Sequence, residues 1–353
     1  MTDASRGVDA SGKVEASGKV EASGKVDASG GVDASGGVER ARALAAGLRV
    51  PVVAAPMFLV SGPELVVAAA RAGILGAFPT QNCRTAEELD GWLAQVAAAV
   101  GDAPWAVNLV THRSNARLAA DLELVVRHRP PVVITALGSP APVVEAVHGY
   151  GGVVVGDVVD LRLAHKAVDA GVDGLACISA GAGGHTGHLS PFAFVSAVRA
   201  FFDGLVVVGG GVADGFGVAG AVAAGADLVY MGTRFLATRE SRAAEDYKHM
   251  VVESASSDLV VSDGVTGAPA SWLRPSLEAH GLDPDHLVFT GDRSYDVAQP
   301  QPKRWAELWA AGQGVGAITR IATVAEVVDA LDTEFHTAAD RLAAVARSGG
   351  GRP

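Results

Sequence analysis

Short apolar runs alternate with longer amphipathic stretches between about residue 39 and residue 240. The runs are nearly continuous in Val, Leu, Ile and Ala, which is typical of strands that are covered on both faces of a parallel sheet. We expect these strands at 50–57, 73–80, 104–110, 130–138, 151–158, 173–179, 204–211 and 226–232. The stretches between them predict helices, and several end in a glycine that suits the left-handed conformation at a helix C-terminus.

This alternation of eight strands with eight helical segments is found in two architectures, a doubly wound open sheet and a closed (β/α)8 barrel. Eight units in roughly 200 residues favour the barrel. We therefore predict an α/β fold with a TIM barrel over residues 39–240. The less regular region 241–353 is expected to be a smaller, mostly helical part that packs on the barrel.

The beginning of the chain has a different pattern. Residues 8–37 repeat a six-residue unit, VDASGK in its first copy and VDASGG in its last, with one valine in each copy. One apolar residue in six cannot form a buried stripe, so burial would not offset the entropy lost on ordering. We predict that residues 1–38 are a flexible tail with no part in the chemistry.

Composition narrows the choice of compartment and partners. The formal net charge is −11 and the chain has no Lys/Arg-rich run, which argues against nucleic acids and anionic membranes as partners. The two cysteines, Cys83 and Cys177, make neither a disulfide framework nor a metal-thiolate cluster, and we expect no metal site. No apolar segment has the length of a membrane helix, and the N-terminus lacks the apolar core of a signal peptide. We expect a cytoplasmic protein.

The candidate chemistry lies where the predicted strands end, because active sites of (β/α)8 barrels are built there. Asn108 is a polar residue in an apolar run, and it either meets a ligand or satisfies a neighbouring backbone group. Asp157 could also serve as an ordinary helix cap. The candidate binding residues at these ends are Ala55, Pro56, Met57, Asn108, Asp157, Ser179, Gly183, Gly184, Gly210, Gly211, Gly232 and Thr233.

Two glycine loops at the last two strands predict a phosphate site. Barrels often bind phosphate between the loops after the seventh and eighth strands, where backbone N–H groups of glycines can donate without obstruction. Gly210 and Gly211 supply such groups on one side, and Gly232 with the Thr233 hydroxyl supplies them on the other. No GxxxxGK motif is present, so a phosphate that belongs to a held cofactor is favoured over a nucleotide that is cleaved.

The loop GAGGHTGHLSP, residues 181–191, follows the sixth strand and predicts a catalytic histidine. Gly183 and Gly184 would let the backbone approach the face or edge of a flat cofactor ring. His185 would then project into the cavity, where an imidazole with a pKa near neutrality can exchange a proton. His188 is expected to face solvent.

Taken together, APM, VNL, GAGGHTG, GGGVADG and YMGTRFLATRES resemble the nitronate monooxygenases, also called 2-nitropropane dioxygenases, and WAELWAAGQGVGAI resembles the family's C-terminal segment. The resemblance covers roughly residues 48–325 and implies an FMN-dependent TIM-barrel oxidoreductase. It implies that His185 is the catalytic base and that the two glycine loops bind the FMN phosphate. The implied reaction oxidises an alkyl nitronate with O2 to a carbonyl compound and nitrite. The expected partners are a nitronate or nitroalkane and O2, and a homodimer is left open.

The chain departs from the family pattern in two motifs, and related enzymes share the motif set. The family commonly reads QGxEAGGH where this chain has ISAGAGGH, so Ile178 and Gly181 replace the glutamine and the glutamate, and GGIADGRG where this chain has GGVADGFG. Ser179 or the backbone would have to make the flavin contacts of that glutamine. The motifs also resemble flavin-dependent enoyl-acyl-carrier-protein reductases, and an NAD(P)H:quinone reductase is a third flavin alternative. A non-enzymatic binding module would leave His185 and both glycine loops unexplained.

Overall fold

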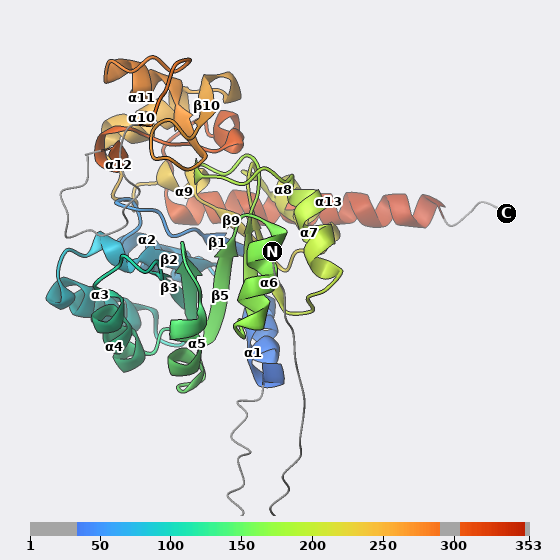
Figure 1. Cartoon of the computed structure of the whole chain (residues 1–353). Coiled ribbons are helices and arrows are strands. Elements are labelled where there is room, and N and C mark those ends of the chain that lie inside the picture. The colour runs from blue at the N-terminus through green and yellow to red at the C-terminus, as the bar shows by residue number, and fades with distance from the viewer. Residues whose placement is uncertain (1–33, 290–303, 350–353) are drawn as a thin grey trace, which may run out of the picture. The chain divides into compact units, whose positions relative to one another are not determined.

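The computed structural model describes residues 34–289 and 304–349, and within them eight parallel strands form a closed barrel (Figure 1). The barrel closes because the last strand pairs with the first, which places Tyr230 opposite Val53. This confirms the predicted TIM barrel. The strands, in order around the barrel, are β1 Val52–Ala54, β2 Leu75–Pro79, β3 Trp105–Val110, β4 Val132–Ala136, β5 Val153–Val158, β6 Gly174–Ile178, β8 Leu205–Gly209 and β9 Leu228–Met231.

Helices surround the strands, and several of them begin at a polar cap. The Thr85, Asp160, Ser190 and Asp214 side chains each accept a hydrogen bond from a backbone N–H in the first helical turn, at 2.7–3.3 Å. Such caps satisfy N–H groups that have no partner inside the helix. The helices that follow the first seven strands are α2 Pro63–Arg71, α3 Ala86–Val100, α4 Leu118–His128, α5 Ala141–His148, α6 Leu161–Asp169, α7 Pro191–Arg199 and α8 Gly215–Ala223.

The strands are apolar throughout because both of their faces are buried. Side chains of one parity face the helices, as Val107, Val133 and Val154 do. Side chains of the other parity fill the barrel interior. The buried residues of this interior layer are Ala41, Val53, Leu75, Ala77, Ala106, Val132, Ile134, Val153, Val155, Ala176, Leu205, Val207, Leu228 and Tyr230.

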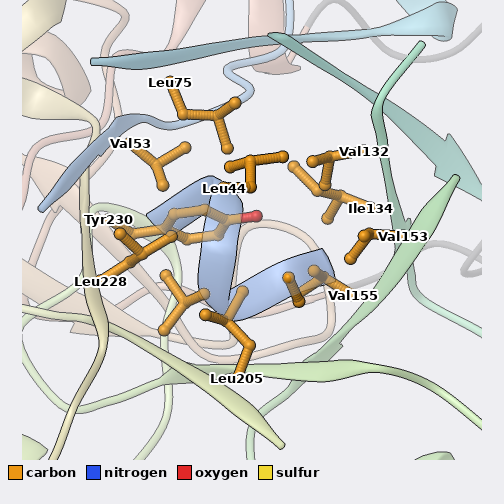
Figure 2. A pocket seen from close by; sticks show the side chains of 12 residues that line it. Leu44, Val53, Leu75, Val132, Ile134, Val153, Val155, Leu205, Leu228 and Tyr230 are labelled. Carbon is orange, nitrogen blue, oxygen red and sulfur yellow. The ribbon is translucent and has the colours of Figure 1, made fainter. Parts of the chain in front are cut away.

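A helix before the first strand, α1 Ala34–Ala46, covers the N-terminal end of the barrel. Its Ala41 is fully buried, and Leu44 lines the small apolar cavity in the barrel interior (Figure 2). Gly37 is also buried, and a Cβ there would lie 1.8 Å from Asp173 Oδ1. Residues 34–38 of the predicted tail therefore belong to a packed helix. The rest of the predicted tail lies outside the described residues.

The region after β9 contributes both to the barrel and to a separate small sheet. After the short helix α9 Thr233–Leu236 come the strands β10 Leu259–Ser262 and β11 Ala270–Leu273. They form a three-stranded antiparallel sheet in the order β10-β11-β7 with β7 Gly184–His185, which lies in the loop after β6. The other elements of this region are α10 Glu245–Glu253, α11 Arg274–Ala279, α12 Arg304–Glu307 and the 3-10 helices η2 Ser256–Asp258 and η3 Gln313–Ala317; a further 3-10 helix, η1 Thr80–Asn82, follows β2.

The final helix, α13 Val324–Gly349, packs on α8 and α2 and so takes the place of the eighth barrel helix. The contact with α8 is close, since a Cβ at Gly215 would lie 2.3 Å from the Leu331 carbonyl oxygen. The region predicted to follow the barrel, 241–353, therefore includes a barrel helix, and residues 237–323 are inserted before it. Among the described helices, none has both the length and the apolarity that crossing a membrane requires.

Candidate active site

Strand register brings the two predicted glycine loops together at the C-terminal end of the barrel, here called the barrel mouth. Gly209 pairs with Tyr230, so the chain leaves β8 and β9 side by side before reaching Gly211 and Gly232. Gly210 and Gly211 have φ values of +139° and +71°, in the range that favours glycine. A Cβ at Gly210 would lie 2.7 Å from the Ala180 carbonyl oxygen, so this position also needs a bare backbone.

These loops fit a phosphate group, although the contribution of Gly211 differs from the prediction. The Gly211 N–H donates to the Gly181 carbonyl at 3.0 Å, so it is already engaged. The residue instead leaves room: the nearest atom to a Cβ built on it is Gln313 Cβ, at 3.8 Å. Thr233 Oγ1 accepts a hydrogen bond from the Gly312 N–H at 2.9 Å, and its own hydrogen remains available to donate. Thr233 also begins α9, the short extra helix at which barrels commonly bind phosphate.

A groove of about 500 Å³ runs beside the first of these loops. Gly210, Gly211 and Gln313 line it, and so do residues of α7 and α8, such as Phe192 and Ala221. Gln313 is absent from the predicted site, because its contact with the loop depends on the return of a distant segment. The sequence offered one signal, since Gln313 lies in the segment that resembles the family's C-terminal part.

The glycines before His185 serve mainly to join three segments of the protein. The Gly181 carbonyl accepts hydrogen bonds from the Gly211 N–H at 3.0 Å and from the Gln313 N–H at 2.9 Å. A Cβ at Gly183 would lie 2.7 Å from the backbone of residues 311 and 312. Gly183 was predicted to let the backbone approach a flat ring, but its bare side faces the protein's own chain. The loop is thereby held between β8 and the C-terminal region.

His185 lies in β7, and its backbone position is fixed by pairing with β11. Ala270 is its partner in this pairing, and Gly184 before it pairs with Ser271 and has a φ of +65°. The ring is half-buried as a whole, and its Nε2 atom is shielded from solvent. His188 is exposed, as predicted. A pairing between residues so distant in sequence could not be read from the loop motif alone.

Three polar side chains belong to the inward-facing parity of the strands near the barrel mouth. Asn108 is 6% exposed, and its Nδ2 donates a long hydrogen bond, 3.4 Å, to the Ile134 carbonyl. Asp157 is half-buried and accepts a hydrogen bond from the Tyr230 hydroxyl on Oδ1 at 3.5 Å. Burial raises the pKa of Asp157 to about 7. Tyr230 is missing from the predicted site, although its alternation with Leu228 in β9 shows that it faces inward.

The remaining predicted residues have ordinary structural contacts at the mouth. Ser179 is fully buried, and its hydroxyl donates to the Cys177 carbonyl at 3.3 Å, which leaves its oxygen able to accept a hydrogen bond. Ala55 donates its N–H to the Met231 carbonyl at 3.0 Å, which ties the loop after β1 to β9. Pro56 is half-buried, and Met57 Sδ lies 3.5 Å from a Cβ built on Gly232. The loop after β1 therefore borders the predicted phosphate loop.

The chain is similar to several known proteins. A family model described as nitronate monooxygenase matches residues 111–334. The chain is 33% identical over 231 residues to the (3aS,4S,5R,7aS)-5-hydroxy-7a-methyl-1-oxo-octahydro-1H-indene-4-carboxyl-CoA dehydrogenase of Rhodococcus jostii, a match that spans 65% of the chain and 64% of the relative, less than two thirds of its length. It is 25% identical over 361 residues to a nitronate monooxygenase of Paraburkholderia phytofirmans, which covers 86% of the chain and 97% of that protein.

Among solved structures, FabK from Thermotoga maritima has a TM-score of 0.72 at 25% identity, covering 87% of this chain and 98% of that one. The family match extends over more than half of the chain and includes the histidine loop, both glycine loops and the beginning of α13. The chain therefore belongs to the nitronate monooxygenase family of oxidoreductases.

Proposed function

We propose that this chain is a flavin-dependent oxidoreductase that binds FMN at the barrel mouth and oxidises alkyl nitronates with O2 to a carbonyl compound and nitrite. One observation carries the proposal: three loops meet at the Gly181 carbonyl. This carbonyl accepts hydrogen bonds from the Gly211 and Gln313 N–H groups, next to the loop of His185. Family membership supports the flavin. When bound, FMN supplies the electron acceptor, which no side chain can provide.

The chain's own residues bind the cofactor and handle the proton. Gly211 leaves space for the phosphate, and Thr233 donates a hydrogen bond to it. His185 accepts the α-proton of a neutral nitroalkane, a carbon acid whose anion is the nitronate. The backbone pairing of β7 with β11 fixes the His185 main chain, so the imidazole starts from a defined position. The substrates are then a small nitroalkane or nitronate and O2.

A second candidate is redox chemistry on an acyl thioester, with NAD(P)H as reductant in the enoyl-reductase direction. One relative favours it, because the Rhodococcus protein is named as a carboxyl-CoA dehydrogenase. The two candidates share a requirement, since a proton next to an electron-withdrawing group must be moved in both. They differ in the compound that exchanges electrons with the flavin.

Anaerobic mixing separates these candidates. We expect an alkyl nitronate to bleach the visible flavin absorbance of the purified protein, because the flavin then accepts its electrons. Bleaching by NADPH alone would replace the proposal by a reductase, and bleaching by an acyl-CoA alone would replace it by a dehydrogenase. A colourless protein that takes up no FMN would contradict both.

Substituting Gly211 by Asp is expected to yield folded protein without flavin. The new carboxylate would enter the space left for the phosphate, and repulsion between two poorly solvated anions costs several kcal/mol, roughly a thousandfold in affinity. The flavin-to-protein absorbance ratio measures the loss, and the thermal midpoint checks the fold.

Gly151 offers a matched control for this substitution. It also has a positive φ, +83°, and has no atom within 4 Å of an added Cβ, but it lies before β5 at the opposite end of the barrel. Gly151→Asp should retain its flavin. Full flavin occupancy in Gly211→Asp would show that the phosphate binds elsewhere.

A further inference from the structure

Asp157 and Tyr230 form a polar pair at the mouth of a barrel whose deeper interior is filled with apolar side chains. Asp157 comes from β5 and Tyr230 from β9, and the phenol oxygen lies 3.5 Å from Asp157 Oδ1. The Tyr230 ring reaches across the interior toward the side chains of β4 and β5, above the apolar cavity that α1 covers (Figure 2). The pair thus separates the closed apolar interior from the barrel mouth.

No cation compensates the Asp157 carboxylate within the described residues. Its recorded hydrogen bond comes from Tyr230, and it takes part in none of the ion pairs recorded there. The titratable groups that act on it are Tyr230 on β9 and Cys177 on β6, and β4 supplies none. Both groups are neutral near pH 7, because burial raises the pKa of Cys177 to about 12 and that of Tyr230 well above its usual range. Desolvation therefore acts on the carboxylate almost alone.

A ligand that fills the mouth would remove the water that still reaches Asp157. The side chain is half-buried, and Oδ2 is not one of the solvent-shielded, unpaired atoms of the described residues, so the carboxylate keeps part of its hydration as long as the mouth is open. Losing that hydration without gaining a cation disfavours the charged form further. The least costly response is to take a proton from solvent and become a neutral acid, which can also donate a hydrogen bond.

We propose that the Asp157 carboxyl takes up one proton from solvent when a flavin fills the barrel mouth, so that flavin binding and protonation are coupled. The inference rests on the proposed flavin site but not on the nitronate reaction. In the balanced step, the protein with an ionised Asp157 binds one flavin and one proton. The product is the flavin complex with a neutral Asp157 carboxyl. Tyr230 is a positioning residue, because it holds Oδ1 without taking up the proton itself.

Flavin affinity measured against pH tests this coupling on the apoprotein. We expect the Kd of riboflavin, followed by fluorescence quenching from about pH 5 to about pH 9, to rise above pH about 7. The limiting slope is about tenfold per pH unit for uptake of one proton. Riboflavin is the main probe, because the phosphate of FMN itself titrates near pH 6. Calorimetry in two buffers of different ionisation enthalpy should give nearly one proton taken up per riboflavin at pH about 8.

Three variants assign the proton to a residue. Asp157→Asn is expected to remove the pH dependence, because its amide is neutral throughout. Tyr230→Phe should move the rise to higher pH, since the phenol hydrogen bond lowers the pKa of Asp157 and its loss raises it. His185→Asn should keep the rise, which excludes His185, because an ordinary imidazole can change its charge near neutral pH.

The outcomes distinguish this inference from the function on which it rests. A Kd for riboflavin that does not change with pH, or a rise that persists in Asp157→Asn, would overturn the coupling and leave the flavin site intact. Failure of FMN and riboflavin to bind at any pH would overturn the proposed function and the coupling together. The calorimetric proton count needs no variant, so it decides the matter even where Asp157→Asn fails to fold.

Discussion

Replacing His185 by Asn is expected to slow turnover of a neutral nitroalkane by roughly 10²–10⁴-fold, the usual contribution of a positioned acid–base group. The neutral substrate must lose its α-proton before it can be oxidised, whereas a preformed nitronate has already lost it. The variant should therefore keep much of its rate on the nitronate. The pairing of β7 with β11 runs through the backbone, so the substitution leaves the loop in place.

Steady-state rates with both forms of one nitroalkane measure this effect. The acidic limb of the pH profile for the neutral form should vanish in His185→Asn, because that limb reports protonation of the imidazole. His188→Asn is the matched control, since His188 is an exposed histidine in the same loop, and its rates should be unchanged. An equal loss on both substrate forms would mean that His185 acts in binding. No loss on either form would make it a bystander.

Deleting residues 1–46, and with them α1, is expected to leave the barrel largely unfolded. The deletion removes Ala41 and Leu44 from the N-terminal end of the interior and exposes the lowest apolar layer there, which includes Leu205 and Leu228. Each large apolar side chain returned to water costs about 1.5–3 kcal/mol. The summed cost for several such side chains approaches the free energy of unfolding of a typical domain, which is about 5–15 kcal/mol.

Thermal unfolding at a fixed protein and flavin concentration measures this loss. Deletion of residues 1–33 is the matched control, because it removes most of the repeat and keeps α1 whole; its thermal midpoint should equal that of the full chain. Equal midpoints for both deletions would show that α1 adds nothing to the stability of the barrel. The Arg42 side chain donates to the Asp203 carbonyl, which gives α1 a second attachment beside its apolar face.

The sequence predicts those parts of the fold that depend on local pattern. All eight barrel strands lie within predicted runs, because strands buried on both faces need continuous apolar residues. The helix α1 was missed because its first residues belong to the repeat, which has no apolar period, and its buried face uses small residues, Gly37 at the end of the repeat and Ala41 after it. The role of α13 was missed because its strand, β9, lies about 90 residues earlier in the chain.

The candidate site also has a part that the local sequence pattern predicts and a part that it does not. The two glycine loops follow neighbouring strands because strand order follows from the fold class, and Gly209 at the end of β8 pairs with Tyr230 in β9. The partner of His185 could not be predicted, since β11 reaches it from an inserted segment. Gly183 was predicted to leave room for a flat cofactor ring. In the structure it leaves room for the backbone of residues 311 and 312. A glycine indicates that another group approaches the backbone closely, but the sequence alone does not identify that group.

The pairing of β1 with β9 also constrains how the protein is made. During synthesis, β1 leaves the ribosome early, but its partner Tyr230 follows far later, and the helix that completes the outer layer ends at Gly349. Contacts so distant in sequence fold slowly, and the partly made chain exposes an open sheet edge in the meantime. We therefore expect nascent chains of this enzyme to depend on chaperones. A truncation within α13, far along the chain from His185, should lower the yield of folded protein more than its catalytic rate.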